Sequence, residues 1–274
     1  MSDFQSINQN NETNLPKREQ HLKSSIRERS HQLLVECSHQ INRRFPDLSS
    51  AFSSLDDPRH RKDYSLEEIL MGGLSLFLFK QGSRNSINNK RREESFSTTY
   101  AHHFGLRLPH QDSICEVLSH MLPEKLDQVK MDLMSALFGQ KCLRKYRLFG
   151  KHYLVAVDAT GVVSFDYPHC EHCLQKKSKN GKVTYFHYVL EAKLVTPQGH
   201  SLSLASEWIE NPEGTFDKQD CEQKAFARLA AKIKKQYPRL DICILADGLY
   251  PNNTVSIFVK AISLSSFSYY KIKR

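Results

Sequence analysis

Long apolar runs are missing from this sequence. No stretch of its 274 residues approaches the roughly 18 apolar residues that a membrane-spanning helix needs. The polar N-terminal residues 1–11 also lack the apolar segment of a secretory signal peptide. The two absences predict a protein without a membrane span, located in the cytoplasm.

Acidic residues are in deficit. Asp and Glu total 30 against 39 Lys and Arg, which gives a formal net charge of +9. Lysines and arginines that neutralise phosphates bind nucleic acid by releasing counterions, so this balance favours a polyanionic partner such as DNA. A basic surface that serves only solubility is the alternative.

Cysteine occurs seven times, an odd number, at irregular spacing. This pattern predicts reduced thiols in the cytoplasm instead of a disulfide framework. The pair Cys170-x-x-Cys173 occurs together with His169 and His172, and thiolates and imidazoles suit tetrahedral Zn²⁺. A second Cys-x-x-Cys pair is absent, although His187 can approach from the next predicted strand. The sequence alone therefore favours reduced surface residues over zinc at Cys170 and Cys173.

The N-terminal part predicts helices. Residues 1–23 have almost nothing to bury and are expected to be disordered. Apolar residues at helical spacing predict a basic amphipathic helix over residues 24–45. Ser65 followed by Glu68 is a capping box, which predicts that a buried helix begins at Leu66.

Further helices are predicted over residues 109–118 and 123–138. The basic stretch 83–97 is either a loop or an exposed helix, and a solvated charge run is as plausible there as a set of phosphate contacts. Residues 24–145 are therefore predicted to form a helical module that binds DNA.

From residue 150 the pattern changes to strands. In order, we expect strands over 153–165, 183–195 and 201–208, a helix capped by Asp217, and a fourth strand over 242–246. Sequential strands with short connections pair antiparallel, and a helical crossover brings the fourth strand parallel to the first. The predicted fold class is a mixed α/β sheet, preceded by the helical module.

Asp158 interrupts the apolar run 153–165, and Asp247 ends the apolar run 242–246. A carboxylate costs several kcal/mol to bury without a partner or a metal, so each is a candidate functional residue. Adjacent strands lie about 4.8 Å apart, which allows the two carboxylates to share a divalent ion. Oxygen ligands select Mg²⁺ or Mn²⁺, which activate water or a 3′-hydroxyl for attack on a phosphodiester. A turn-capping role, especially at Asp247-Gly248, is the structural alternative.

This order of elements resembles the ribonuclease H-like core of the DDE transposases of bacterial insertion sequences. The segments that carry the resemblance are AVDATG at 156–161, CEHCL at 170–174, KNGKVTYFH at 179–187, KQDCEQKAF at 218–226 and ADGLYPN at 246–252. Residues 57–70 are similar to the helical region that precedes that core. The resemblance implies a nucleoid-associated protein that cuts and joins DNA at the terminal repeats of an element, and it leaves a homo-oligomer open.

By this resemblance Asp158 and Asp247 are the first two metal-binding acids, and the third is a glutamate on a later helix. No Asp or Glu follows Asp247 in this sequence. Residues 256–274 lose the resemblance, so we expect a frameshift or an early stop there, a partial core over 150–255, and a transposase fragment without catalytic activity.

Two other functions remain open on the sequence. The chain can be a catalytically silent DNA-binding protein that interferes with an intact transposase. It can also be a metal-dependent nuclease that uses an upstream acid, Glu191 or Glu207.

Overall fold

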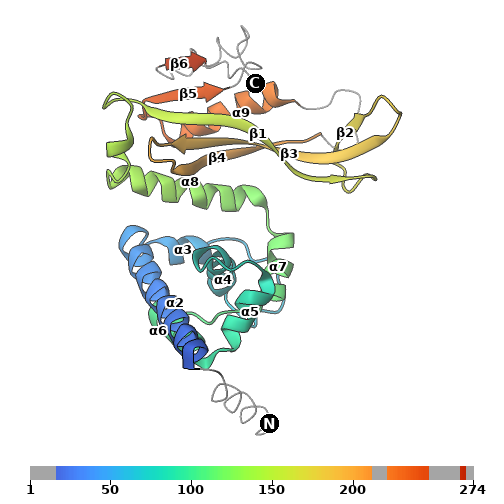
Figure 1. Cartoon of the computed structure of the whole chain (residues 1–274). Helices are drawn as coiled ribbons and strands as arrows, with labels where there is room; N and C mark the ends of the chain where they lie inside the picture. The colour runs from blue at the N-terminus through green and yellow to red at the C-terminus, as the bar shows by residue number, and fades with distance from the viewer. Residues whose placement is uncertain (1–16, 212–220, 247–265, 270–274) are drawn as a thin grey trace. The chain divides into compact units, whose positions relative to one another are not determined.

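The computed structural model describes residues 17–211, 221–246 and 266–269. Figure 1 shows an N-terminal group of helices and a C-terminal sheet with helices of its own, and the chain divides into two compact units on this basis. Within the described part of the chain, no helix combines the length and the apolar character that crossing a membrane requires.

The boundary between the units falls inside helix α8 (Pro123–Gly139), between Lys125 and Leu126. The sequence instead predicted that the helical module continues to residue 145. In the structure the apolar side of α8, with Met131 and Met134, packs into the core of the sheet.

The helices of the first unit fill most of residues 17–120. They are α2 (Lys17–Arg44), α3 (Leu48–Ser53), α4 (Leu66–Leu78), α5 (Arg84–Arg92), α6 (Glu94–Phe104) and α7 (Gln111–His120). Helix α2 begins inside the stretch 1–23 that was expected to be disordered, and residues 1–16 lie outside the described part. The basic stretch 83–97 contains α5 and the start of α6, so it is helical.

The core of this unit is formed by apolar side chains from several helices. Its most deeply buried side chains are Leu34, Ile69, Ile87, Phe96, Tyr100 and Ile114. Ser75 of α4 lies beside Tyr100 of α6, with the two hydroxyl oxygens 3.4 Å apart. Burial raises the pKa of the Tyr100 hydroxyl well above its usual range. The predicted helix from Leu66 is therefore confirmed, and it is buried as expected.

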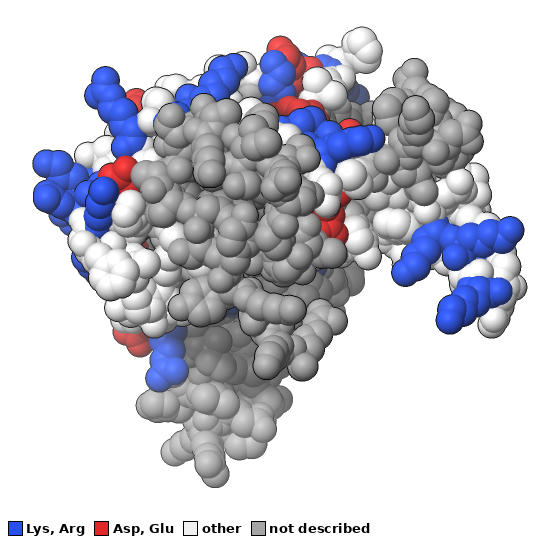
Figure 2. All heavy atoms as spheres, turned by 90° about the horizontal axis from the view of Figure 1, so that it is seen from above, with Lys and Arg blue, Asp and Glu red and all other residues white. Residues whose placement is uncertain are grey.

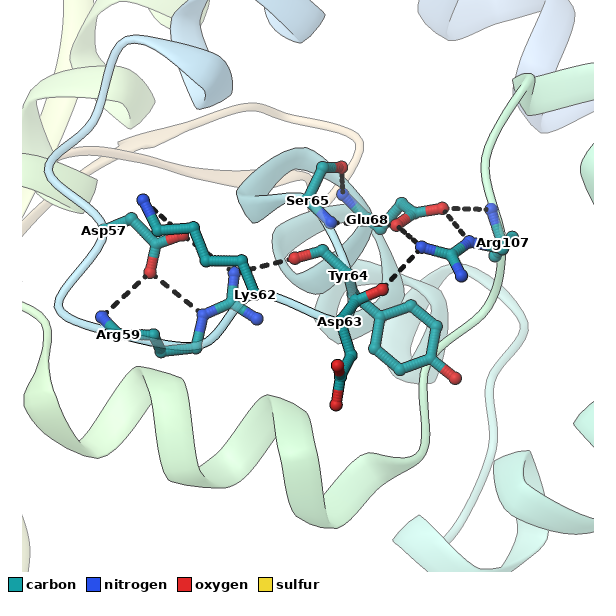
Figure 3. Close-up of polar contacts among 8 residues, drawn as sticks. All are labelled: Asp57, Arg59, Lys62, Asp63, Tyr64, Ser65, Glu68 and Arg107. Carbon is teal, nitrogen blue, oxygen red and sulfur yellow. Dashed lines mark hydrogen bonds and ion pairs between the residues drawn. The ribbon is translucent and has the colours of Figure 1, made fainter.

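Helix α4 begins with the predicted capping box. The Ser65 hydroxyl accepts the Glu68 backbone N–H at 3.1 Å, and the Glu68 carboxylate accepts the Ser65 backbone N–H at 2.9 Å. Arg107 closes the network from the other side, because its Nε and Nη2 donate to the two Glu68 oxygens at 2.8 and 2.9 Å (Figure 3). Burial by itself raises the pKa of Glu68, but the hydrogen bonds from Arg107 and Ser65 outweigh it and hold that pKa below its usual value.

The loop before α4 is held by a second carboxylate. Asp57 accepts hydrogen bonds from Arg59 Nε and Nη2, both at 2.9 Å, and Arg59 also donates to the Tyr64 carbonyl at 2.9 Å (Figure 3). The side chain of Asp57 is only 9% exposed. The hydrogen bond from Arg59 lowers the pKa of Asp57 to about 2. This pairing gives Asp57 and Arg59 a structural role.

The second unit is built on a six-stranded mixed sheet. Its strands are β1 (Tyr153–Phe165), β2 (Leu174–Lys177), β3 (Val183–Val195), β4 (Ser201–Ile209), β5 (Ile242–Ala246) and β6 (Ser266–Tyr269). The order is β2-β3-β1-β5-β6, and β4 also pairs with β3. Strand β3 pairs antiparallel with β1, β2 and β4, whereas β5 pairs parallel with β1. The predicted antiparallel strands, helix and parallel strand are confirmed.

Two strands were not predicted. Strand β2 lies between the first two predicted strands, and β6 lies within residues 256–274, where the resemblance is lost. Strand β6 pairs parallel with β5.

One face of the sheet is covered by helices α8 and α9 (Glu222–Gln236). Alternate residues of β1 point into this core, including Val155 and Val157, and Phe226 and Leu229 of α9 pack on them. A fully buried phenylalanine contributes about 3–5 kcal/mol relative to alanine, so this face dominates the stability of the unit. The N-cap of α9 is Cys221, and the expected cap, Asp217, lies outside the described residues.

Beyond the helix-covered region, β1 and β3 continue with β2 as a projecting arm (Figure 1). The register between β1 and β3 shifts at residues 161–163, and such a bulge bends a strand. Gly161 is required there because a Cβ at this position would lie 2.8 Å from the Tyr188 ring.

Candidate functional site

Asp158 lies in the middle of β1 on the face opposite the helices. Its neighbour Val157 is buried among the core residues, and successive side chains of a strand point to opposite faces. Asp158 is exposed, and one of its carboxylate oxygens accepts the backbone N–H of Ala159 at 3.0 Å. The carboxylate is therefore accessible to solvent. The apolar run around it had suggested that it would be buried in the core.

A second carboxylate starts from the position facing Asp158. In the antiparallel ladder Asp158 is opposite Glu191 of β3, and directly opposite residues share a face. Glu191 is half-buried. Among the described residues, neither carboxylate has an ion-pair partner within 4 Å, in contrast to Asp57 and Glu68 of the first unit.

Asp247 lies outside the described residues. The parallel ladder between β1 and β5 ends with Ala156 opposite Leu245. In the sequence, Asp158 and Asp247 each follow two residues after a member of this last pair.

Glu207, the other upstream acid considered from the sequence, is used differently. Its carboxylate lies 2.6 Å from Arg228 Nε and 3.0 Å from Lys232 Nζ, both on α9. Lys232 also contacts Asp127 at 3.3 Å. Glu207 therefore belongs to an ion-pair network between α8, α9 and β4, and of the two upstream acids only Glu191 faces Asp158.

Basic side chains gather on the projecting arm. Figure 2 shows Lys and Arg side chains on this part of the molecule, and the exposed lysines there are Lys176, Lys177, Lys179 and Lys182. Lys182 pairs with Asp166 at 3.0 Å, on the exposed surface of the arm. Between the strands of the arm lies an open groove with Gly161, Phe186 and Tyr188 in its lining. Lysines beside exposed aromatic side chains suit a nucleic-acid backbone and its bases.

The segment with Cys170 and Cys173 folds back against β3. The two sulfur atoms lie 3.7 Å apart, and each lies 3.3 Å from Nε2 of His187. Among the described residues, this is the one group of three or more Cys, His, Asp or Glu ligand atoms that come within 4.8 Å of one another. His187, which the sequence analysis named only as a remote third ligand, is thus brought to both thiols.

The surroundings of this group affect its protonation. Burial, and the nearby Cys173 thiol, raise the pKa of Cys170. Burial also lowers the pKa of His187, as do His169 and His172, while Glu210 acts in the opposite sense.

Asn211 is a site residue that the sequence analysis missed. It is 1% exposed, its Nδ2 donates to the Cys173 carbonyl at 2.9 Å, and its carbonyl lies 2.9 Å from Nδ1 of His172. The Asn211 backbone N–H donates to the His172 carbonyl at 3.2 Å. Asn211 follows the third predicted strand and belongs to no sequence motif, so nothing in the sequence indicated this role.

Neither kind of comparison with known proteins identifies the chain: no protein-family model matches it, and no curated protein matches its sequence.

Proposed function

We propose that this chain is a DNA-binding protein of the insertion-sequence transposase type, with a ribonuclease H-like sheet. The observation that carries the proposal is the parallel pairing of β1 and β5 in a register that ends with Ala156 opposite Leu245. Asp158 and Asp247 follow at equal distances in sequence. This equal offset supports a shared carboxylate site on neighbouring strands.

The donor set fits Mg²⁺ or Mn²⁺. Asp158 offers exposed carboxylate oxygens, Glu191 faces it across the ladder, and hard oxygen ligands are those that these ions prefer. When bound, the ion would polarise a phosphodiester and activate the attacking oxygen. Asp158 and Asp247 would hold it, and the lysines of the arm would contact DNA phosphates.

DNA binding is tested by fluorescence anisotropy with duplex DNA over a series of salt concentrations. We expect the logarithm of the binding constant to fall linearly with the logarithm of salt, by about 0.9 for each phosphate contact. A Lys176→Gln, Lys177→Gln double variant should reduce this slope. Lys224→Gln, an exposed lysine on α9, is the matched control. Absence of salt-dependent binding would contradict the proposal.

Catalysis is tested separately by nicking of supercoiled plasmid with Mn²⁺. For this 274-residue chain, in which no Asp or Glu follows Asp247, we expect binding without cleavage, as in a silent DNA-binding protein.

The nuclease is a second candidate, and the opposition of Asp158 and Glu191 favours it over a nuclease built on Glu207. Nicking that both Asp158→Asn and Glu191→Gln abolish would select this candidate.

A further inference from the structure

Two sulfur atoms from the loop between β1 and β2 lie close to one imidazole nitrogen from β3. Nε2 of His187 has a single position for an in-plane hydrogen bond, yet Cys170 Sγ and Cys173 Sγ both lie 3.3 Å from it. One hydrogen bond therefore cannot account for both contacts. A cation at the centre of the three atoms accounts for all of them.

The distances match a tetrahedral zinc ion. Bond lengths of about 2.3 Å to sulfur and about 2.0–2.1 Å to nitrogen imply about 3.8 Å between two sulfur ligands and about 3.5 Å between sulfur and nitrogen. The observed separations are 3.7 Å between the sulfur atoms and 3.3 Å from each sulfur to Nε2. A movement of a few tenths of an ångström would admit the ion.

Strand register brings these ligands together. In the ladder between β2 and β3, Leu174 is opposite Phe186, so the preceding Cys173 comes level with the following His187. The hairpin turn that sets this register contains Gly181, whose φ of 82° suits glycine. The ligand set is therefore a product of the hairpin and not of the Cys-x-x-Cys spacing alone.

Hydrogen bonds support the sulfur ligands. The Cys170 backbone N–H points at Cys173 Sγ at 3.4 Å, and the Cys173 side chain is fully buried. Asn211 fixes the backbone of the loop from the end of β4 through its bonds to Cys173 and His172. Partners of this kind orient the ligands of a metal site and are part of its affinity.

We propose that Cys170, Cys173 and His187 bind one zinc ion, which ties the loop after β1 to β3 and fixes the base of the projecting arm. Cys170 is exposed, and on its side a water molecule completes the tetrahedron. Thiolate ligands select zinc over the Mg²⁺ proposed for the carboxylates, so the two sites bind different ions. The zinc site requires neither DNA binding nor catalysis.

The test uses the full 274-residue chain, purified under reducing conditions. We expect one zinc ion per chain by elemental analysis. Titration of the metal-free chain with Co²⁺ should give the visible absorption of a tetrahedral site and the ultraviolet absorption of thiolate ligands. Cys170→Ser, Cys173→Ser and His187→Ala should each weaken binding by more than about 100-fold, because loss of an outer-shell partner alone costs about 10–100-fold.

Two kinds of variant separate loss of a ligand from loss of the fold. His187→Cys keeps three ligands and should retain the metal, with stronger thiolate absorption. Cys221→Ser removes an exposed thiol elsewhere and should bind Co²⁺ like the parent chain. A parent chain that takes up neither Zn²⁺ nor Co²⁺, or that holds a Cys170–Cys173 disulfide under these conditions, would overturn the proposal.

Discussion

Two groups of metal-type ligands lie in the same sheet, and they differ in chemistry and in setting. Asp158 and Glu191 are carboxylates that face each other on the open side of β1 and β3. Cys170, Cys173 and His187 are soft ligands whose donor atoms already lie within 4.8 Å of one another. The sequence pattern drew attention to Asp158 of the first group, whereas the donor atoms of the second group are brought together by the fold.

The difference teaches how to tell the two sites apart. Thiolate and imidazole ligands at tetrahedral spacing form a site that holds its ion in the absence of substrate. Carboxylates on an exposed strand bind Mg²⁺ or Mn²⁺ weakly, together with water and phosphate oxygens. The first site should therefore be detected by metal content and stability, and the second only by activity or by metal titration.

Two carboxylates of the first unit, Asp57 and Glu68, show how a carboxylate with a structural role is paired in this protein. Asp57 and Glu68 are nearly buried, and each meets an arginine in a two-point hydrogen bond. Asp158 is exposed, and among the described residues no arginine or lysine forms an ion pair with it within 4 Å. This contrast supports a ligand role for Asp158 over a structural one.

The largest effect is expected from removal of zinc. A chelator should lower the melting temperature of the sheet unit, because the loop after β1 loses its connection to β3. Fluorescence of Trp208, the single tryptophan, reports this unit. Trypsin should then cleave at the arm lysines Lys176 and Lys177, which mass spectrometry would locate.

The Cys173→Ser chain is the control, because a chelator should change it no further. If the parent chain melts and digests identically with and without a chelator, zinc does not hold the arm.

Asn211→Ala should act on the zinc site through its neighbours. Alanine removes the hydrogen bond from Asn211 Nδ2 to the Cys173 carbonyl and keeps the two backbone bonds to His172, so we expect zinc affinity to fall by about 10-fold, the lower end of the range for loss of an outer-shell partner, with all three ligands present. Competition with a chelator of known affinity measures the change. Asn180→Ala, at the exposed turn of the arm, is the matched control and should leave zinc affinity unchanged.

The sequence predicted what local patterns specify. The capping box at Ser65 and the strand over residues 153–165 are both confirmed in the structure. The parallel pairing of β1 with β5 follows from a general rule on crossovers. These features depend on residues close in sequence or on chain topology.

What the sequence missed depends on register and packing. Strand β2 is polar because it lies on the arm, so no apolar pattern marked it. Helix α8 has an apolar side that fits either unit, and only its contacts with the sheet decide between them. The approach of His187 to Cys173 requires the β2–β3 register, which a count of cysteine pairs does not contain.

Acid titration should reveal how much the paired carboxylates of the first unit stabilise the fold. The pKa values of Asp57 and Glu68 are lowered in the folded chain, so both carboxylates stabilise it above their unfolded pKa values of about 4. This stability should be lost as the pH falls from about 4 to about 2, the folded pKa of Asp57. Melting followed by helical circular dichroism measures the loss.

Asp57→Asn should flatten this pH dependence. A variant that keeps the full acid sensitivity of the parent chain would show that Asp57 does not carry it.

Asp158→Asn should have the smallest effect on stability. It should raise the unfolding free energy slightly, whereas loss of a zinc ligand should lower it. Like charges directly opposite in a ladder destabilise it, by about 0.2–1 kcal/mol, and Asp158 faces Glu191. The variant should therefore gain a few tenths of a kcal/mol in unfolding free energy in metal-free buffer, measured by urea denaturation with Trp208 fluorescence.

The same variant should lose the stabilisation that Mn²⁺ gives the parent chain, because a ligand stabilises only the state that binds it. Asp166→Asn, which removes a surface ion pair with Lys182, should show neither the gain nor the altered Mn²⁺ response. If Asp158→Asn instead destabilises the metal-free chain, the carboxylate is a structural part of β1, and the comparison with Asp57 fails.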